Sequence, residues 1–204
     1  MIAQRRRLLG AACVAALLLG GCDRPGADAP KSAQFRGVDI TGASYARNWS
    51  LPDTTGRTRS LADFKGKVTV VFFGYTQCPD VCPTTLAELA QVKKALGPRG
   101  NELQGVFITV DPERDTPEIL RSYMANFDPG FIALRGSVEE TKAVAKEFKV
   151  FFAKVPGRAE GSYTMDHTAA SIVFDARGLP RLYERYGGGV EALTSDVKAL
   201  LDAG

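Results

Sequence analysis

The sequence predicts an α/β domain with a central mixed sheet flanked by helices, and two features of its order support this. Apolar stretches of strand length alternate with segments whose apolar residues recur at helical spacing, beginning with 68–73 and 84–96. The chain then ends with two apolar stretches, 169–174 and 182–186, around a good hairpin turn, and a closing helix at 190–201. A right-handed crossover after the first strand makes the first two strands parallel.

Residues 1–21 have the features of a lipoprotein signal peptide. Arg5, Arg6 and Arg7 precede an apolar stretch at 8–19, which is too short to span a bilayer. Leu-Gly-Gly before Cys22 resembles the bacterial lipoprotein signal, in which this cysteine is lipidated and becomes the new N-terminus. The alternative is an ordinary secretory signal with a cysteine there by chance.

Residues 22–34 are rich in proline, glycine, alanine and aspartate without an apolar period, which is typical of a flexible tether. The folded domain is therefore expected over 35–204. Within its first part, 35–60, Trp49-Ser50-Leu51 before Pro52-Asp53 predicts short strands joined by a turn, with Trp49 packed in the core.

The remaining elements follow from periodicity and helix-start signals. Residues 68–73 are apolar throughout, as in a strand buried on both faces. Ser137 with Glu140 forms a capping-box pattern, which predicts a helix from there to about 148. The other expected elements are a strand at 106–110, a helix from Thr116-Pro117 to about 127, and short strands at 131–134 and 150–155.

Charge and cysteine content narrow the function. Residues 1–21 hold three arginines and no acidic residue, so the rest of the chain carries 23 basic and 23 acidic residues. Nothing in this balance suggests a nucleic-acid binder, which would show a basic face. Cys13 leaves with the signal and Cys22 carries lipid, so the domain keeps only Cys78 and Cys82. A single pair of closely spaced cysteines outside the cytoplasm is more typical of a functional site than of a disulfide that stabilises the fold.

The two domain cysteines occur in Gly74-Tyr-Thr-Gln-Cys-Pro-Asp-Val-Cys-Pro83, directly after the strand at 68–73. Because each cysteine precedes a proline, both are expected in extended or loop conformation, just before a helix that starts near Thr84. Thr85 with Glu88 fits a capping box. The partial positive charge of the helix N-terminus favours the thiolate form that binds metals.

His167 is the only histidine in the chain, and it stands just before the strand at 169–174. If that strand runs antiparallel to 68–73, His167 faces the cysteines. Two thiolates and one imidazole suit copper, whereas a structural zinc site normally has four ligands. Asp166 either orients His167 by accepting a hydrogen bond from its ring or is a plain loop residue. Met165, next to the histidine, is either a soft metal ligand or, as we expect, a residue packed in the core.

Other residues near this end of the sheet have two readings each. Asp80 and the acidic loop 111–115 either make turns and helix caps or form a surface that meets a recipient protein. Tyr75 either covers the site or packs.

Three motifs, GYTQCPDVCPTTL, DPERDTPE and YTMDHTAA, occur in this order and together closely resemble the Sco (SenC) family of copper-binding assembly factors. The resemblance implies a thioredoxin-like fold with extra N-terminal strands and copper ligands at Cys78, Cys82 and His167. It also implies a membrane-tethered protein that helps to assemble the copper-A centre of cytochrome c oxidase. The implied partners are the copper-A subunit and other periplasmic copper chaperones or thiol reductants. With the lipoprotein signal, the expected place is the periplasmic side of a bacterial inner membrane.

Three functions stay open at this point. The first is a copper metallochaperone, and the second is a thiol–disulfide oxidoreductase that reduces the cysteines of the copper-A centre. The third is a copper or redox sensor. His167 favours the first over the second, as does the spacing of Cys78 and Cys82, which is one residue longer than the CxxC pair of thioredoxin-like oxidoreductases. Gln77 departs from the family, because many relatives have histidine there.

Overall fold

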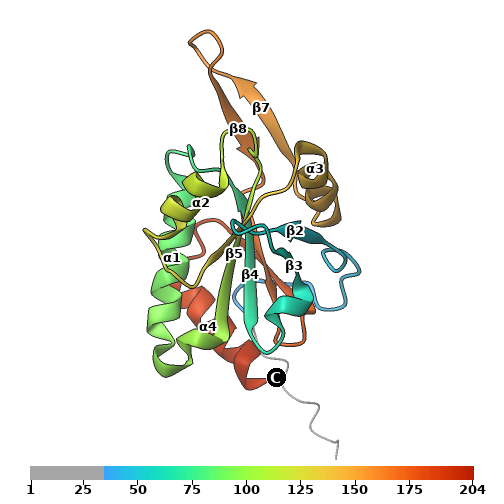
Figure 1. Ribbon diagram of the computed structural model, residues 1–204. Coiled ribbons are helices and arrows are strands. Elements are labelled where there is room, and N and C mark those ends of the chain that lie inside the picture. The colour runs from blue at the N-terminus through green and yellow to red at the C-terminus, as the bar shows by residue number, and fades with distance from the viewer. Residues whose placement is uncertain (1–34) are drawn as a thin grey trace, which may run out of the picture. The chain divides into compact units, whose positions relative to one another are not determined.

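The computed structural model describes residues 35–204, which form a six-stranded mixed sheet between layers of helices (Figure 1). The predictions for the signal 1–21, the tether 22–34 and the lipidation of Cys22 lie outside the described residues. The sheet order is β1-β10-β9-β4-β5-β6. The strands are β1 (Val38–Asp39), β4 (Val68–Gly74), β5 (Leu103–Thr109), β6 (Ile132–Leu134), β9 (Ala170–Phe174) and β10 (Pro180–Arg185).

Strand directions place the start of β9 beside the end of β4. Strands β4 and β5 are parallel, with Phe72 opposite Phe107, as the sequence predicts. Strand β9 runs antiparallel to β4, with Ser171 opposite Phe72. The segment just before β9 therefore lies at the end of the sheet where β4 leads into the cysteine loop, which is the arrangement the cysteine–histidine site requires.

Four α-helices cover the two faces of the sheet. Figure 1 shows α1, α2 and α4 on one side and α3 on the other, beside the small β2–β3 ribbon. The helices are α1 (Val81–Ala95), α2 (Pro117–Met124), α3 (Val138–Glu147) and α4 (Val190–Asp202), with short 3-10 helices at Leu61–Phe64 and Gly97–Glu102. Across residues 35–204, no helix combines the length and apolar character needed to cross a membrane.

Helix starts follow their sequence signals at α2 and α3. The Ser137 hydroxyl accepts from the Glu140 amide while the Glu140 carboxylate accepts from the Ser137 amide, so the predicted capping box of α3 is confirmed. The Thr116 side chain caps α2 by accepting from the Ile119 amide, and Pro117 opens that helix.

Aromatic side chains alternate across β4 and fill the core on both faces. Phe72 packs near Phe107 with ring centroids 6.0 Å apart. Phe73 points to the other face and meets Phe148 at 5.0 Å, and Trp49 joins Phe148 at 5.7 Å. The predicted packing role of Trp49 is thus confirmed, and β4 is buried along its whole length.

Two small ribbons lie outside the main sheet. The first pairs β2 (Ser50–Pro52) with β3 (Thr58–Ser60), which confirms the turn predicted around Pro52-Asp53. The second pairs β7 (Phe152–Pro156) with β8 (Tyr163–His167) and projects beyond the end of the sheet that leads into the cysteine loop (Figure 1). Strand β8 was not predicted, because only alternate residues of this short polar segment are turned inward.

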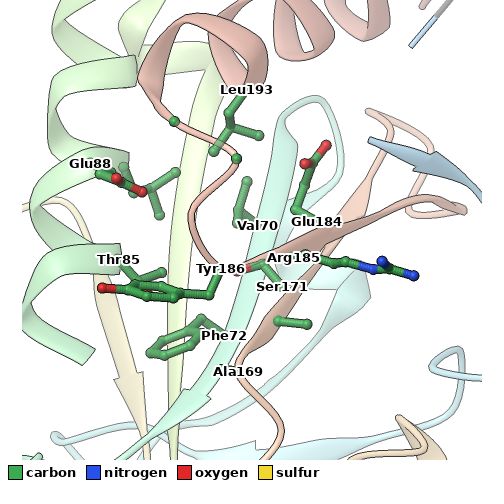
Figure 2. Close-up of a pocket in the computed structure, with 14 residues that line it drawn as sticks. Val70, Phe72, Thr85, Glu88, Ala169, Ser171, Glu184, Arg185, Tyr186 and Leu193 are labelled. Atoms are coloured by element: carbon green, nitrogen blue, oxygen red, sulfur yellow. The ribbon is translucent and has the colours of Figure 1, made fainter. Parts of the chain in front are cut away.

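A pair of carboxylates sits where β10 meets α4. The buried carboxylate of Asp196 accepts the backbone amides of Arg36 and Gly37, at 2.9 and 2.8 Å. Glu184 lines a cavity between the sheet, α1 and the start of α4 (Figure 2), and its Oε1 has no hydrogen-bond partner among the described residues. Burial, and then the charge of Asp196, raise the pKa of Glu184 to about 7.

Glu184→Gln is expected to stabilise the protein at alkaline pH and leave it unchanged at acid pH. The pKa of Glu184 is raised in the folded state from its ordinary 4.5, so the stability it contributes below that value is lost as pH rises to about 7. At pH 8 the gain should be about 1 kcal/mol, since solvent screens this half-buried group. Urea unfolding at several pH values measures it, with Glu191→Gln as an exposed control. Equal stabilities of Glu184→Gln and wild type at pH 8 would contradict this account.

Candidate metal centre

The loop after β4 carries both cysteines, and it differs from the prediction in one respect. Helix α1 begins at Val81, so Cys82 is helical and lies in the first turn, not in a loop before the helix. The helix extends back past Pro83 because a first-turn residue needs no intrahelical partner for its N–H. The predicted capping box at Thr85 is wrong as well, since the Thr85 hydroxyl donates to the carbonyl of Val81, at 2.8 Å.

The early start of α1 brings the backbone amide of Cys82 within hydrogen-bond distance of Sγ of Cys78. The Cys82 amide donates to the Sγ of Cys78 at 3.4 Å, so an N–H of the first turn points at that sulfur. The contact orients Sγ of Cys78 at the N-terminus of α1, beside the other cysteine. Cys78 is half-buried, whereas Cys82 is fully buried. Burial raises the pKa of the Cys82 thiol, so it keeps its proton at neutral pH until something displaces it.

His167 completes a compact three-residue group at the end of β8. The ligand atoms of Cys78, Cys82 and His167 all lie within 4.8 Å of one another, and Nε2 of His167 is 3.5 Å from Sγ of Cys82. Both cysteines are free thiols. The structure therefore brings together the three residues that the sequence singled out, in an arrangement that can hold one metal ion.

The histidine ring is oriented by a backbone carbonyl. Nδ1 of His167 lies 3.2 Å from the carbonyl of Thr168, so we assign the proton to Nδ1 and the free lone pair to Nε2, which faces the sulfurs. Asp166 points to the opposite, exposed face of the ribbon, so the acceptor role considered for it belongs to Thr168. Burial lowers the pKa of His167, which keeps the ring neutral and able to bind a metal.

Aromatic and apolar side chains enclose the histidine. Phe72 and Tyr75 meet the His167 ring edge-on, with centroids 6.1 and 6.0 Å away. Tyr75 is itself buried and packs against the ring, and Met165 is buried in the core. The packing expected of Met165 is confirmed.

Comparison with known proteins agrees with the motifs. The SCO1/SenC family model matches residues 38–202, which is most of the chain. This chain belongs to the SCO1/SenC family. It is 37% identical over 132 residues to a SCO2-like protein of Rickettsia felis, a match that spans 64% of each chain. It is 34% identical over 153 residues to the human mitochondrial SCO2 homolog, spanning 74% of this chain and 58% of the relative.

Solved structures of the Sco family share the fold. The copper-bound structure of ScoI of Bradyrhizobium japonicum matches with a TM-score of 0.68 and 37% identity, covering 81% of this chain and 99% of that one. The apo Sco1 protein of Thermus thermophilus matches with a TM-score of 0.74 and 35% identity, covering 84% and 99%. The expected thioredoxin-like fold is thereby confirmed.

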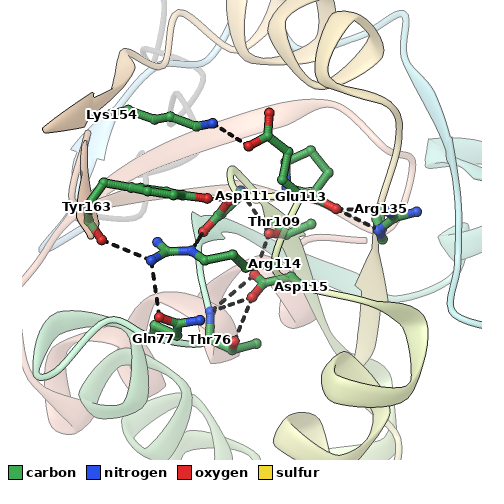
Figure 3. Close-up of polar contacts among 11 residues, drawn as sticks. Thr76, Gln77, Thr109, Asp111, Glu113, Arg114, Asp115, Arg135, Lys154 and Tyr163 are labelled. Carbon is green, nitrogen blue, oxygen red and sulfur yellow. Dashed lines mark hydrogen bonds and ion pairs between the residues drawn. The ribbon is translucent and has the colours of Figure 1, made fainter. Parts of the chain in front are cut away.

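The acidic loop of this Sco chain, residues 111–115, is mostly internal. Asp111 and Asp115 are buried, so neither contributes the recipient-facing surface that was one reading of this motif. The Asp115 carboxylate accepts from the Thr76 amide at 3.1 Å and from the hydroxyls of Thr76 and Thr109 at 2.6 and 2.5 Å (Figure 3). It ties the start of the cysteine loop to the end of β5.

Gly74→Ala is expected to disturb the Sco site from the strand side. A Cβ at Gly74 would lie 2.8 Å from Sγ of Cys82 and 2.7 Å from the Phe107 ring, so the sulfur or the ring has to move. Overpacking of this kind costs about 1–3 kcal/mol of stability, and it should weaken metal binding. Urea unfolding and copper competition measure the two effects. Gly188→Ala is the matched control, because Gly188 does not have positive φ and a Cβ there would meet its nearest neighbour, the carbonyl oxygen of Arg185, at an ordinary 3.5 Å. Wild-type values for Gly74→Ala would show that the sulfur has free space.

Proposed function

We propose that this Sco chain is a membrane-anchored copper metallochaperone that binds copper through Cys78, Cys82 and His167 and assists assembly of the copper-A centre of cytochrome c oxidase. One observation carries the proposal, namely the convergence of three donor atoms of these residues within 4.8 Å. Two thiolates and one imidazole suit Cu(I) and Cu(II). The copper-bound relative from Bradyrhizobium japonicum supports the choice of metal.

The donor set favours a cargo ion over a permanent structural metal. Zinc in a structural site normally has four ligands, whereas this group has three. The sequence contains no second histidine, and its other cysteines, Cys13 and Cys22, belong to the signal and the lipidation site of our proposal. An open coordination position and the half-buried Cys78 give a recipient ligand room to approach.

Loading requires the reduced pair, since a disulfide offers no thiolate. Each thiol gives up its proton as its sulfur binds copper, and the raised pKa of Cys82 means that the metal displaces this proton. In transfer, a thiolate of the recipient binds the copper while Cys78 releases it, and Cys82 and His167 follow. The copper keeps its oxidation state, and both sulfurs regain protons from solvent.

The anchor is the sequence-based part of the proposal. Lipid on Cys22 would hold the domain on the periplasmic side of the inner membrane, and the tether 22–34 would let it reach a membrane-bound recipient. The proposed recipient is the copper-A subunit of cytochrome c oxidase. Other periplasmic copper chaperones or thiol reductants would supply copper or electrons.

A second candidate function, reduction of the recipient's disulfide, is favoured by the unequal burial of the two cysteines. The half-buried Cys78 can attack a recipient disulfide as thiolate, which forms a mixed disulfide and releases one recipient thiolate. The buried Cys82 then loses its proton, attacks the Cys78 sulfur and releases the second thiolate. Two electrons pass to the recipient, and the pair ends as a disulfide.

A paired assay separates the two functions. The copper-loaded chain is mixed with the reduced, metal-free copper-A domain, and the reduced metal-free chain is mixed with that domain's disulfide form. We expect copper to move to the recipient and His167→Ala to impair this transfer while leaving thiol exchange intact. Fast disulfide reduction with no copper transfer would refute the chaperone and support the oxidoreductase.

A further inference from the structure

Arg114 lies between the cysteine loop and the strand that carries His167. Its guanidinium forms an ion pair with the buried carboxylate of Asp111, and its side chain is 22% exposed (Figure 3). The same group reaches in two further directions, toward Gln77 on one side and Tyr163 on the other. These two residues belong to the two segments that supply the metal ligands.

The contact on the cysteine side is made next to a ligand. Nη1 of Arg114 donates to the side-chain oxygen of Gln77, at 3.1 Å. Gln77 directly precedes Cys78. One residue further back, Thr76 is held by Asp115, which follows Arg114 in the chain. Residues 76–77 are thus fastened to the acidic loop by two consecutive side chains of that loop.

The contact on the histidine side holds Tyr163, the first residue of β8. Nη1 of Arg114 donates to the carbonyl of Tyr163 at 2.9 Å, and the guanidinium stacks on the Tyr163 ring at 3.6 Å from its centroid. The Tyr163 hydroxyl donates to Asp111 at 2.9 Å. A β-strand is stiff over its few residues, so a clamp on Tyr163 also limits where His167 lies at the other end.

The ribbon needs such a clamp because it is not part of the main sheet. Strand β8 pairs only with β7 in the described structure, and an isolated two-stranded ribbon is marginally stable by itself. The clamp also depends on the shape of arginine, whose planar fork donates in several directions while its face stacks on a ring. Lysine keeps the charge beside Asp111 but cannot do both.

We propose that Arg114 is a positioning residue that clamps the β7–β8 ribbon to the cysteine loop and so keeps His167 within reach of the two sulfurs. The proposal rests on the metal site of the proposed function but concerns its assembly in the absence of metal. A plain structural role, in which Arg114 only neutralises Asp111, predicts that Arg114→Lys behaves as wild type.

The first test needs no metal. In the reduced, metal-free chain, amide hydrogen exchange is compared between β7–β8 and the central strands β4 and β5. Arg114→Lys should speed exchange in the ribbon by about tenfold, the loss expected for one stacking and one hydrogen-bond contact, and leave β4 and β5 unchanged. Unchanged exchange everywhere, or an equal rise in ribbon and central strands, overturns the proposal. Arg177→Lys, at an exposed arginine beside Asp175, is the matched control.

The second test measures copper binding and the part that the imidazole nitrogen of His167 has in it. Arg114→Lys should weaken Cu(II) binding by about tenfold and diminish the nitrogen coupling in its electron paramagnetic resonance spectrum, while Cu(I) held by the thiols changes less. Gln77→Ala, at an exposed position, removes only the contact to the cysteine loop and should give a smaller loss that disappears in the Arg114→Lys background. Additive losses would show that the two residues act separately and would overturn the clamp. Failure of wild type to bind copper would refute the proposed function but leave the exchange test valid.

Discussion

Cys82→Ser is expected to abolish tight copper binding. The Cys82 sulfur is fully buried and lies 3.5 Å from Nε2 of His167, so it is the donor that joins the helix to the ribbon. A serine hydroxyl keeps its proton at neutral pH and is a hard ligand, which suits copper poorly. Loss of outer-shell partners alone costs about 10–100-fold in metal affinity, so loss of this ligand should exceed about a hundredfold. Competition titration of the reduced protein against a Cu(I) chelator measures it.

Cys22→Ser is the matched control for this result, because it removes a cysteine that our proposal assigns to lipidation and not to the metal. It should leave copper affinity unchanged. Serine has nearly the same size as cysteine and fits the buried position, so we expect Cys82→Ser to fold. Urea unfolding checks this. If Cys82→Ser folds and still binds copper as wild type does, the ion is not held by the Cys78–Cys82 pair.

His167→Ala is expected to weaken the binding of Cu(II) much more than the binding of Cu(I). Two thiolates are sufficient to hold Cu(I), whereas Cu(II) also depends on the imidazole nitrogen. We expect Cu(II) affinity to fall by at least about a hundredfold, with loss of the thiolate charge-transfer spectrum, and Cu(I) affinity to fall by about tenfold or less. Visible absorption follows Cu(II), and chelator competition follows Cu(I).

Asp166→Asn serves as the companion variant at the neighbouring position. Its side chain is exposed on the other face of the ribbon, and the carbonyl of Thr168 already accepts from Nδ1 of His167. Asp166→Asn should therefore bind both forms of copper nearly as wild type does. Equal effects of His167→Ala on Cu(I) and Cu(II) would contradict the separate role of the imidazole.

Most of the domain was predictable because its elements have strong local signals. The uninterrupted apolar run of β4 identified a strand buried on both faces, and the Ser137–Glu140 pair marked the start of α3. The start of α1 was misplaced because the conformational bias before Pro83 is weaker than the tolerance of a first helical turn for proline. Residue types therefore located the site, whereas the backbone geometry around Cys82 depended on packing.

The metal ligands were predictable from the sequence, but the residues that hold the ligand segments in place were not. Cys78, Cys82 and His167 were identified from their chemistry and from motifs resembling one family. The contacts of Arg114 and Asp115 join segments separated by up to 49 positions in sequence, and no local pattern encodes them. The choice between Asp166 and Thr168 as partner of the histidine depended on which face of β8 each side chain occupies, and β8 itself was not predicted.

The most direct test of the central claim is X-ray absorption at the copper edge of the reduced chain loaded with one equivalent of Cu(II). The three-donor group predicts one copper per chain with two sulfur neighbours and one imidazole nitrogen. Binding without sulfur neighbours, or no specific binding by the reduced chain, would contradict the copper site and leave disulfide reduction as the function to test next.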